Sequence, residues 1–169
     1  FTELLDERQE EFSGEALQIL QQLAVGAYMT FMKTEKCADY CEKLMESSND
    51  YSIRLSAMYC YLDSGRPEKC AALAEKLLAE NEDDVAGLYY MGAAAAALKD
   101  TDTVIDCAEK LAEQLKTTEY PGYVDRYLSQ LISRITIYRS SDLEGCYDDF
   151  TDSQLQRIEQ NTFLNAYIQ

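Results

Sequence analysis

The chain has 169 residues, 47% of them hydrophobic, with 31 acidic and 15 basic side chains and a net charge of −16. That length and apolar content suit one domain or one short array of repeats. The negative charge argues against nucleic acid and against direct contact with anionic membranes, because both present phosphate groups to a protein surface. The sequence has no apolar run long enough to cross a bilayer and no signal-type opening segment. Since it begins at Phe1 with a usable helix, we interpret it as a piece of a longer protein.

Apolar residues recur every three or four positions along the chain, a period typical of helices, and no strand-like alternation persists. In chain order, the pattern predicts helices at 2–11, 15–33, 35–46, 50–64, 67–80, 84–98, 101–116, 121–139 and 152–168. Pro67 and Pro121 suit the first turn of a helix, and Gly65 suits the end of one. Thr101 and Asp102 are predicted to cap the helix that begins beside them.

One segment of the chain is repeated. EKCADYCEKLM at 35–45 returns as EKCAALAEKLL at 68–78, which is 33 positions later, and a weaker copy follows as CAEKLAEQL at 107–115. A period of 33 or 34 residues is typical of helix-turn-helix repeats that stack into a solenoid. Such repeats bury their apolar faces against one another and form a long surface that binds other chains.

Residues 51–118 resemble two tetratricopeptide repeats. In a copy that starts at Tyr51, Tyr61, Gly65 and Cys70 match the family's Tyr, turn Gly and small residue, and the next copy has Gly92 where the family prefers Gly. A copy from Gln18 fits less well. The resemblance implies an all-α, right-handed superhelix of antiparallel helix hairpins, forming one domain over 1–169. Its repeats would lie near 18–50, 51–84 and 85–118, with capping helices at 119–169.

The resemblance also implies a binding surface on the inner face, which the first helix of each repeat lines. These positions are Ile19, Gln22, Leu23, Gly26, Met29 and Thr30, then Ser52, Leu55, Ser56, Tyr59, Leu62 and Asp63, then Ala86, Tyr89, Tyr90, Ala93, Ala96 and Ala97. Tyr123 and Tyr127 extend the face if the register continues. The residues predicted to bind a peptide are Leu55, Tyr59, Tyr89, Tyr90 and Ala93. The alternative is that these tyrosines pack inside the fold.

The predicted inner face contains no Lys or Arg. Relatives that bind chaperone C-termini grip a carboxylate with a clamp of Lys, Arg and Asn on these helices. Here the corresponding positions are Gln22, Gly26, Ser56, Ala86 and Tyr90, which argues against that class of partner.

Side chains that carry chemistry are sparse or dispersed. The six cysteines are predicted to be reduced and mostly buried, with a disulfide framework as the alternative, and this favours a reducing, cytoplasmic compartment. Cys37 and Cys41 share a helix face, but zinc needs two more ligands and the chain has no His. No carboxylate pair stands out from the solvated faces, and the acidic stretch at 142–152 lacks the spacing of a calcium loop. We therefore expect no catalytic residues, no metal and no cofactor.

These observations predict a non-catalytic scaffold that binds a protein or peptide in a concave, tyrosine-bearing groove. One alternative is an oligomerisation module that self-associates through an uncapped end. Another is a docking or regulatory domain of a larger enzyme or chaperone-associated protein.

Overall fold

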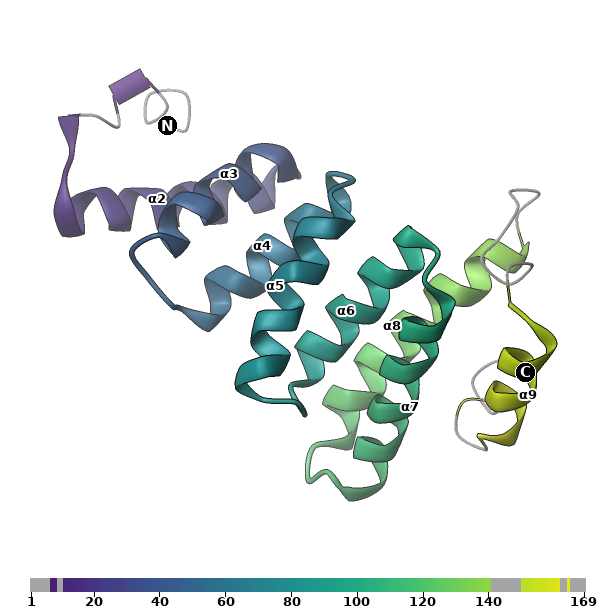
Figure 1. The fold of residues 1–169 in the computed structure, drawn as a ribbon. Helices are drawn as coiled ribbons and strands as arrows, with labels where there is room; N and C mark the ends of the chain where they lie inside the picture. The colour runs from purple at the N-terminus through teal and green to yellow at the C-terminus, as the bar shows by residue number, and fades with distance from the viewer. Residues whose placement is uncertain (1–6, 9–10, 141–149, 162–163, 165–169) are drawn as a thin grey trace. The chain divides into compact units, whose positions relative to one another are not determined.

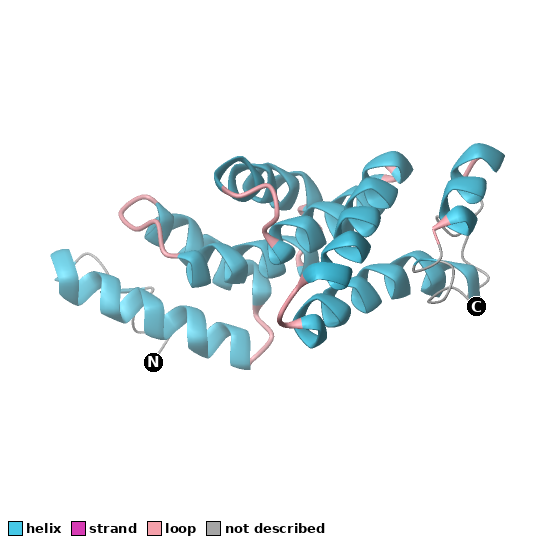
Figure 2. Ribbon diagram, turned by 90° about the horizontal axis from the view of Figure 1, so that it is seen from below, coloured by secondary structure: helices cyan, strands magenta, loops and turns pink. Residues whose placement is uncertain are grey.

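The computed structural model describes residues 7–8, 11–140, 150–161 and 164. All regular structure in these residues is helical, as Figure 2 shows, and this confirms the predicted all-α class. Most of the helix expected at 2–11 lies outside the described residues. So do most of the residues between the helices expected at 121–139 and 152–168, which include the sixth cysteine, Cys146.

The chain divides into two compact units, residues 1–66 and 67–169. Unit 1 contains α2 (Gly14–Thr30), α3 (Thr34–Met45) and α4 (Tyr51–Asp63), which are labelled in Figure 1. Unit 2 contains α5 (Pro67–Glu80), α6 (Val85–Leu98), α7 (Thr101–Thr117), α8 (Pro121–Ser140) and α9 (Asp152–Gln160). The repeat expected at 51–84 spans this division, so the pairing of its two helices stays a prediction.

Most helix ends follow from the residues that stand there. Pro67 and Pro121 begin α5 and α8 as predicted. The carboxylate of Asp84 caps α6 by accepting the Gly87 amide at 2.6 Å. The cap predicted for α7 was wrong by one or two residues: Asp100, rather than Thr101 or Asp102, accepts the Thr103 amide at 3.3 Å. Its carboxylate also accepts the hydroxyl of Thr103, which holds the cap in place.

Three helices end in the same turn at a spacing of 33 and 34 residues. The left-handed residues are Met32, Gly65 and Lys99, with φ of 54°, 70° and 62°. Each turn has the two amide bonds of a Schellman motif, as where Arg66 donates to the Tyr61 carbonyl at 2.7 Å and Gly65 to Leu62 at 3.2 Å. This motif explains why α2 ends at Thr30, three residues before the predicted end. The sequence period is therefore also a period of backbone conformation.

The cores of both units contain the repeated positions of α3, α5 and α7, which are the second helices of the predicted repeats. In unit 1, α3 packs against α2 and α4, and in unit 2, α6 packs against α5, α7 and α8. Three columns of equivalent positions are buried in every copy: Cys37, Cys70 and Val104; Cys41, Ala74 and Ala108; and Leu44, Leu77 and Leu111. Burial of Cys37 and Cys70 confirms the prediction that they behave as small apolar residues.

The last helix is shorter than predicted. α9 ends at Gln160 because Asn161 leaves the helical region, and its side-chain oxygen accepts the Leu164 amide at 3.2 Å. The prediction of one helix over 152–168 is therefore wrong at Asn161, and most of its remainder lies outside the described residues. Helix α9 is held to α7 by Arg157, whose guanidinium donates to Glu109 at 2.9 Å and to Asp106 at 2.6 Å.

Candidate functional site

Four tyrosines form a continuous row of rings in unit 2, which we call the tyrosine row: Tyr90, Tyr89, Tyr127 and Tyr123. The centroid of the Tyr89 ring lies 5.0 Å from that of Tyr90 and 5.0 Å from that of Tyr127. Tyr127 in turn contacts Tyr123 at 5.1 Å, edge to face. These spacings and tilts are those at which aromatic rings attract one another.

Two packed helices create this row. Tyr89 and Tyr90 lie on α6, whereas Tyr123 and Tyr127 lie one turn apart on α8. Gly92 lets the helices approach, because a β-carbon there would lie 2.9 Å from a methyl group of Leu131 on α8 and 3.1 Å from the β-carbon of Cys107 on α7. The sequence suggested the extension to Tyr123 and Tyr127 only if the register continued. The ring contacts bring Tyr123 and Tyr127 together with Tyr89 and Tyr90, whereas the register itself stays a prediction.

Arg134 on α8 lies beside the row. Its Nε donates to the Tyr89 hydroxyl at 3.2 Å, and its guanidinium carbon lies 5.9 Å from the centroid of the Tyr89 ring. The side chain is exposed. The predicted inner-face positions contain no Lys or Arg, but this arginine, which was not among them, lies against Tyr89. Arg134 lies two turns beyond Tyr127 on the same face of the helix, so the helical period alone relates it to the tyrosines.

Exposure differs strongly along the row. Tyr89 is only 6% exposed and Tyr123 is 48% exposed, while Tyr90 and Tyr127 are half-buried. Burial, and then the nearby Tyr123, raise the pKa of Tyr127 to about 12. Its hydroxyl therefore keeps its proton at neutral pH and can donate a hydrogen bond. The row has a buried, fixed centre and an accessible end.

The five residues predicted to bind a peptide are distributed over both units. Tyr89 and Tyr90 are in direct contact in unit 2, and Ala93, one turn from Tyr89, is 1% exposed. Leu55 and Tyr59 lie one turn apart on α4 in unit 1, and both are half-buried. Burial of Tyr89 and Ala93 leaves little of either side chain for a ligand, so Tyr90, Tyr123 and Tyr127 offer the accessible ring surface in unit 2.

In unit 1, the residues of the predicted inner face all retain exposure. None of the six positions on α2 or the six on α4 is buried, with Ile19 at 49% and Leu23 at 57%. In unit 2, by contrast, Ala86, Tyr89, Ala93 and Ala96 on α6 are buried. The contact of α6 with α8 accounts for the burial of Tyr89, whose ring lies against Tyr127.

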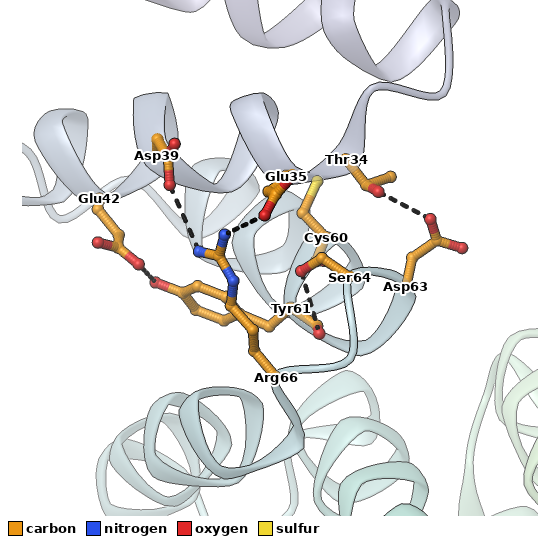
Figure 3. Close-up of polar contacts among 9 residues, drawn as sticks. All are labelled: Thr34, Glu35, Asp39, Glu42, Cys60, Tyr61, Asp63, Ser64 and Arg66. Carbon is orange, nitrogen blue, oxygen red and sulfur yellow. Dashed lines mark hydrogen bonds and ion pairs between the residues drawn. The ribbon is translucent and has the colours of Figure 1, made fainter.

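A polar network joins α3 to the end of α4 (Figure 3). Arg66 reaches Asp39 at 3.4 Å and Glu35 at 3.5 Å, and the Tyr61 hydroxyl donates to Glu42 at 3.0 Å. Thr34 donates to Asp63 at 2.8 Å on the other side of Cys60 in this view. Burial and the Glu42 carboxylate raise the pKa of Tyr61. These contacts hold α3 and the end of α4 together. Arg66 pairs with Asp39 and Glu35, so these charged groups are bound to one another, and we assign the network a structural role.

The described cysteines carry free, buried thiols, and three of them gather in unit 1. Cys37 accepts hydrogen bonds from Cys41 and Cys60, which lower its pKa, while the pKa values of those two donors are raised. The Cys60 thiol lies 3.4 Å from the sulfur of Met29. Within the described part of the chain, no three His, Cys, Asp or Glu side chains are arranged as a metal site.

No protein-family model, curated protein or solved structure matches this chain. Among the residues searched, no helix is both long enough and apolar enough to span a bilayer.

Proposed function

We propose that this chain is a non-catalytic scaffold of tetratricopeptide-like repeats that binds a protein or peptide segment on the tyrosine row. The observation that carries the proposal is the row itself, in which Tyr89 is buried and Tyr123 is 48% exposed. A tyrosine held by its neighbours loses little side-chain freedom when a ligand covers it. Tyrosine also combines a large apolar ring with a hydrogen-bonding tip, which is why it is enriched in binding interfaces.

The proposed solenoid is supported by the repeated geometry of the chain. Left-handed turns at Met32, Gly65 and Lys99 end three helices at the repeat spacing. The columns that contain Cys37 and Leu44 are buried in all three copies. A superhelix of stacked hairpins explains both features, because each repeat buries its apolar face on the next.

The binding proposal is tested by replacing the accessible rings. Tyr123→Ala combined with Tyr127→Ala is expected to weaken a bound peptide by about 2 kcal/mol or more, as is typical of aromatic anchors. Peptides selected by display on the immobilised chain serve as ligands, and fluorescence anisotropy measures their affinity. Phe31→Ala is the control, because Phe31 is 72% exposed but lies in unit 1. Equal affinity of wild type and a folded double variant would contradict the proposal.

The sequence favoured a different pair, Tyr59→Ala with Tyr89→Ala. Tyr59 lies on α4 in unit 1, outside the tyrosine row, whereas Tyr89 receives a hydrogen bond from Arg134 and contacts two other rings. Its loss would disturb packing in addition to recognition. Tyr123 and Tyr127 therefore separate binding from stability more clearly.

Self-association is the second candidate, favoured by the exposed apolar residues near and along α2. Phe12 is 39% exposed, Ile19 49% and Leu23 57%. Ile19 and Leu23 are one turn apart, so they form a stripe on one face of the helix. Light scattering after size exclusion tests this function: a dimer that Leu23→Glu converts to a monomer would support it. A wild-type monomer at high concentration would contradict it.

The remaining alternative is that the chain docks or regulates a larger enzyme or chaperone-associated protein of which it is a part. We propose that the segment itself needs no cofactor, and that it works in a reducing, cytoplasmic compartment, where its buried thiols would stay reduced. The full open reading frame tests the docking alternative, because it would reveal any catalytic domain beside these residues.

A further inference from the structure

Charge is distributed unevenly between the helices. In a chain of net charge −16, α6 contains no charged residue, and α8 contains three arginines and one aspartate. Of the described helices, α8 is the one with a net positive charge. Among the side chains that the structure describes, α8 contributes Arg126 and Arg134 against Asp125, so it carries a small positive excess within an acidic molecule.

Two exposed arginines of α8 lie beside the tyrosine row, one at its buried centre and one next to Tyr127. Arg134 is exposed and donates to Tyr89, and Arg126 is exposed beside Tyr127, whose ionisation its charge influences. An exposed guanidinium that is fixed by an aromatic neighbour is well prepared to pair with a carboxylate, because part of its rotational freedom is already lost. Tyrosine hydroxyls and arginine side chains together make this surface rich in hydrogen-bond donors.

We propose that the partner bound on the tyrosine row is an extended acidic peptide segment, with an apolar or aromatic side chain over Tyr123 and Tyr127 and a carboxylate on Arg134. This inference rests on the proposed function and specifies its ligand. The distance supports the pattern, because Arg134 follows Tyr123 by 11 positions, which is about 16 Å along α8. About five residues of extended chain cover that span.

The pairing does not depend on a peptide terminus. Arg134 lies outside the positions at which relatives hold a terminal carboxylate, which here are Gln22, Gly26, Ser56, Ala86 and Tyr90. A side-chain carboxylate within a chain therefore suffices. The arginines of α8 would attract an acidic partner to this surface. The rest of the chain is strongly negative and would repel the same partner, so binding would be specific for this surface.

The test is a selection from a random peptide display library on the full chain, followed by synthesis of the enriched peptides with amide-blocked ends. Enriched sequences are expected to carry Glu or Asp about five residues from an aromatic or aliphatic anchor. Arg134→Gln should weaken them by about tenfold or more, as expected for loss of a charge-assisted hydrogen bond. Lys110→Gln, which removes an exposed charge from α7, is the matched control and should leave affinity unchanged.

A second measurement guards against a folding effect of Arg134→Gln. Changing the acidic residue of the peptide to Gln should weaken binding to wild type but not to Arg134→Gln, which shows coupling between the two groups. Arg126→Gln, in a residue with no hydrogen bond to the row, provides a second charge variant. Additive effects of the peptide and Arg134 changes would overturn the pairing.

The outcomes separate this inference from the proposed function. Peptides that need Tyr123 and Tyr127 but are neutral or basic would overturn the acidic partner and leave the binding function intact. Peptides indifferent to both tyrosines, or no enrichment at all, would overturn both. A mixed-sequence single-stranded oligonucleotide that binds more tightly than the peptides, in an Arg134-dependent way, would replace the acidic peptide by nucleic acid. The net charge of −16 argues against that result.

Discussion

Gly92 shows how one missing side chain determines where the tyrosine row forms. Three helices meet at this residue, and Leu131 of α8 and Cys107 of α7 occupy the space that a β-carbon would need. Leu131 is fully buried, so it has no open space into which to rotate. The approach of α8 to α6, and with it the tilted contact of Tyr127 with Tyr89, depends on this glycine.

We expect Gly92→Ala to lower the free energy of unfolding by about 1–3 kcal/mol, because the added methyl group overpacks the contact. Gly26→Ala is the matched control. Gly26 is an exposed helical glycine of α2, and a β-carbon there meets nothing within 4 Å. Its replacement should stabilise the protein by about 0.5–1 kcal/mol through helix propensity. Urea unfolding measures both, and a neutral Gly92→Ala would show that α6 and α8 have room between them.

Met32 occupies a left-handed position that is glycine in one of the other two copies and lysine in the other. It has φ of 54°, where Gly65 in the next copy has 70°. Met32→Gly is expected to stabilise the protein by about 1 kcal/mol, since the left-handed conformation is strained for a residue with a β-carbon. Met32 is 62% exposed, so little burial is lost. Gly65→Ala should destabilise by a similar amount, and thermal unfolding of both variants gives the sign of each change.

At the scale of the helix, the repeated columns decide which face of α3, α5 and α7 is buried. Leu44, Leu77 and Leu111 are 1%, 3% and 0% exposed. Cys41, Ala74 and Ala108 lie one turn before these leucines and are also buried. Each of the three helices therefore buries a small residue and a leucine on the same face.

Leu77→Ala is expected to cost about 2–5 kcal/mol, the range for emptying a buried leucine site. The matched control is Leu98→Ala at the end of α6, where the leucine is 42% exposed. That change should cost well under half as much, because less apolar surface leaves the water on folding. Denaturant titration compares the two. A loss below about 0.5 kcal/mol for Leu77→Ala would place Leu77 on the surface.

For the molecule as a whole, buried thiols and phenols make stability depend on alkaline pH. Burial raises the pKa of Cys70 and of Cys107 from 9.0 to about 12, and that of Tyr127 from 10.0 to about 12. Each group keeps its proton in the folded chain at pH values where the unfolded chain releases it. Unfolding is then favoured as pH rises from the ordinary pKa toward the raised one.

The free energy of unfolding is therefore expected to fall between about pH 9 and pH 12, by about 1 kcal/mol per pH unit for each such thiol. Cys107→Ala should make the free energy of unfolding fall less steeply with pH in this range. Any change in stability at neutral pH is a separate effect of the substitution. Chemical unfolding at fixed pH values measures the dependence. The same burial predicts that Cys37 and Cys70 react slowly with a thiol reagent in the native state and rapidly in denaturant.

Local signals in the sequence were sufficient for the helices, most of their boundaries and the buried columns. Proline at 67 and 121 and the apolar period act within a few residues of chain, so they are readable without knowing the neighbours. The end of α2 was missed because nothing marks Met32 as a left-handed residue. The register of the inner face on α2 and α4 agrees with its exposure in unit 1.

Only the tertiary structure decided which tyrosines are buried, which remain accessible and which charge lies beside them. Tyr89 and Tyr59 occur in equivalent helices, yet Tyr89 is buried, with its ring against Tyr127 of α8, while Tyr59 stays half-exposed. Arg134 lies 45 residues from Tyr89 in the chain, and their contact requires α6 and α8 to pack through Gly92. Helical periodicity specifies the face on which a residue lies, but the partner of that face is set by contacts between distant segments, which no local pattern encodes.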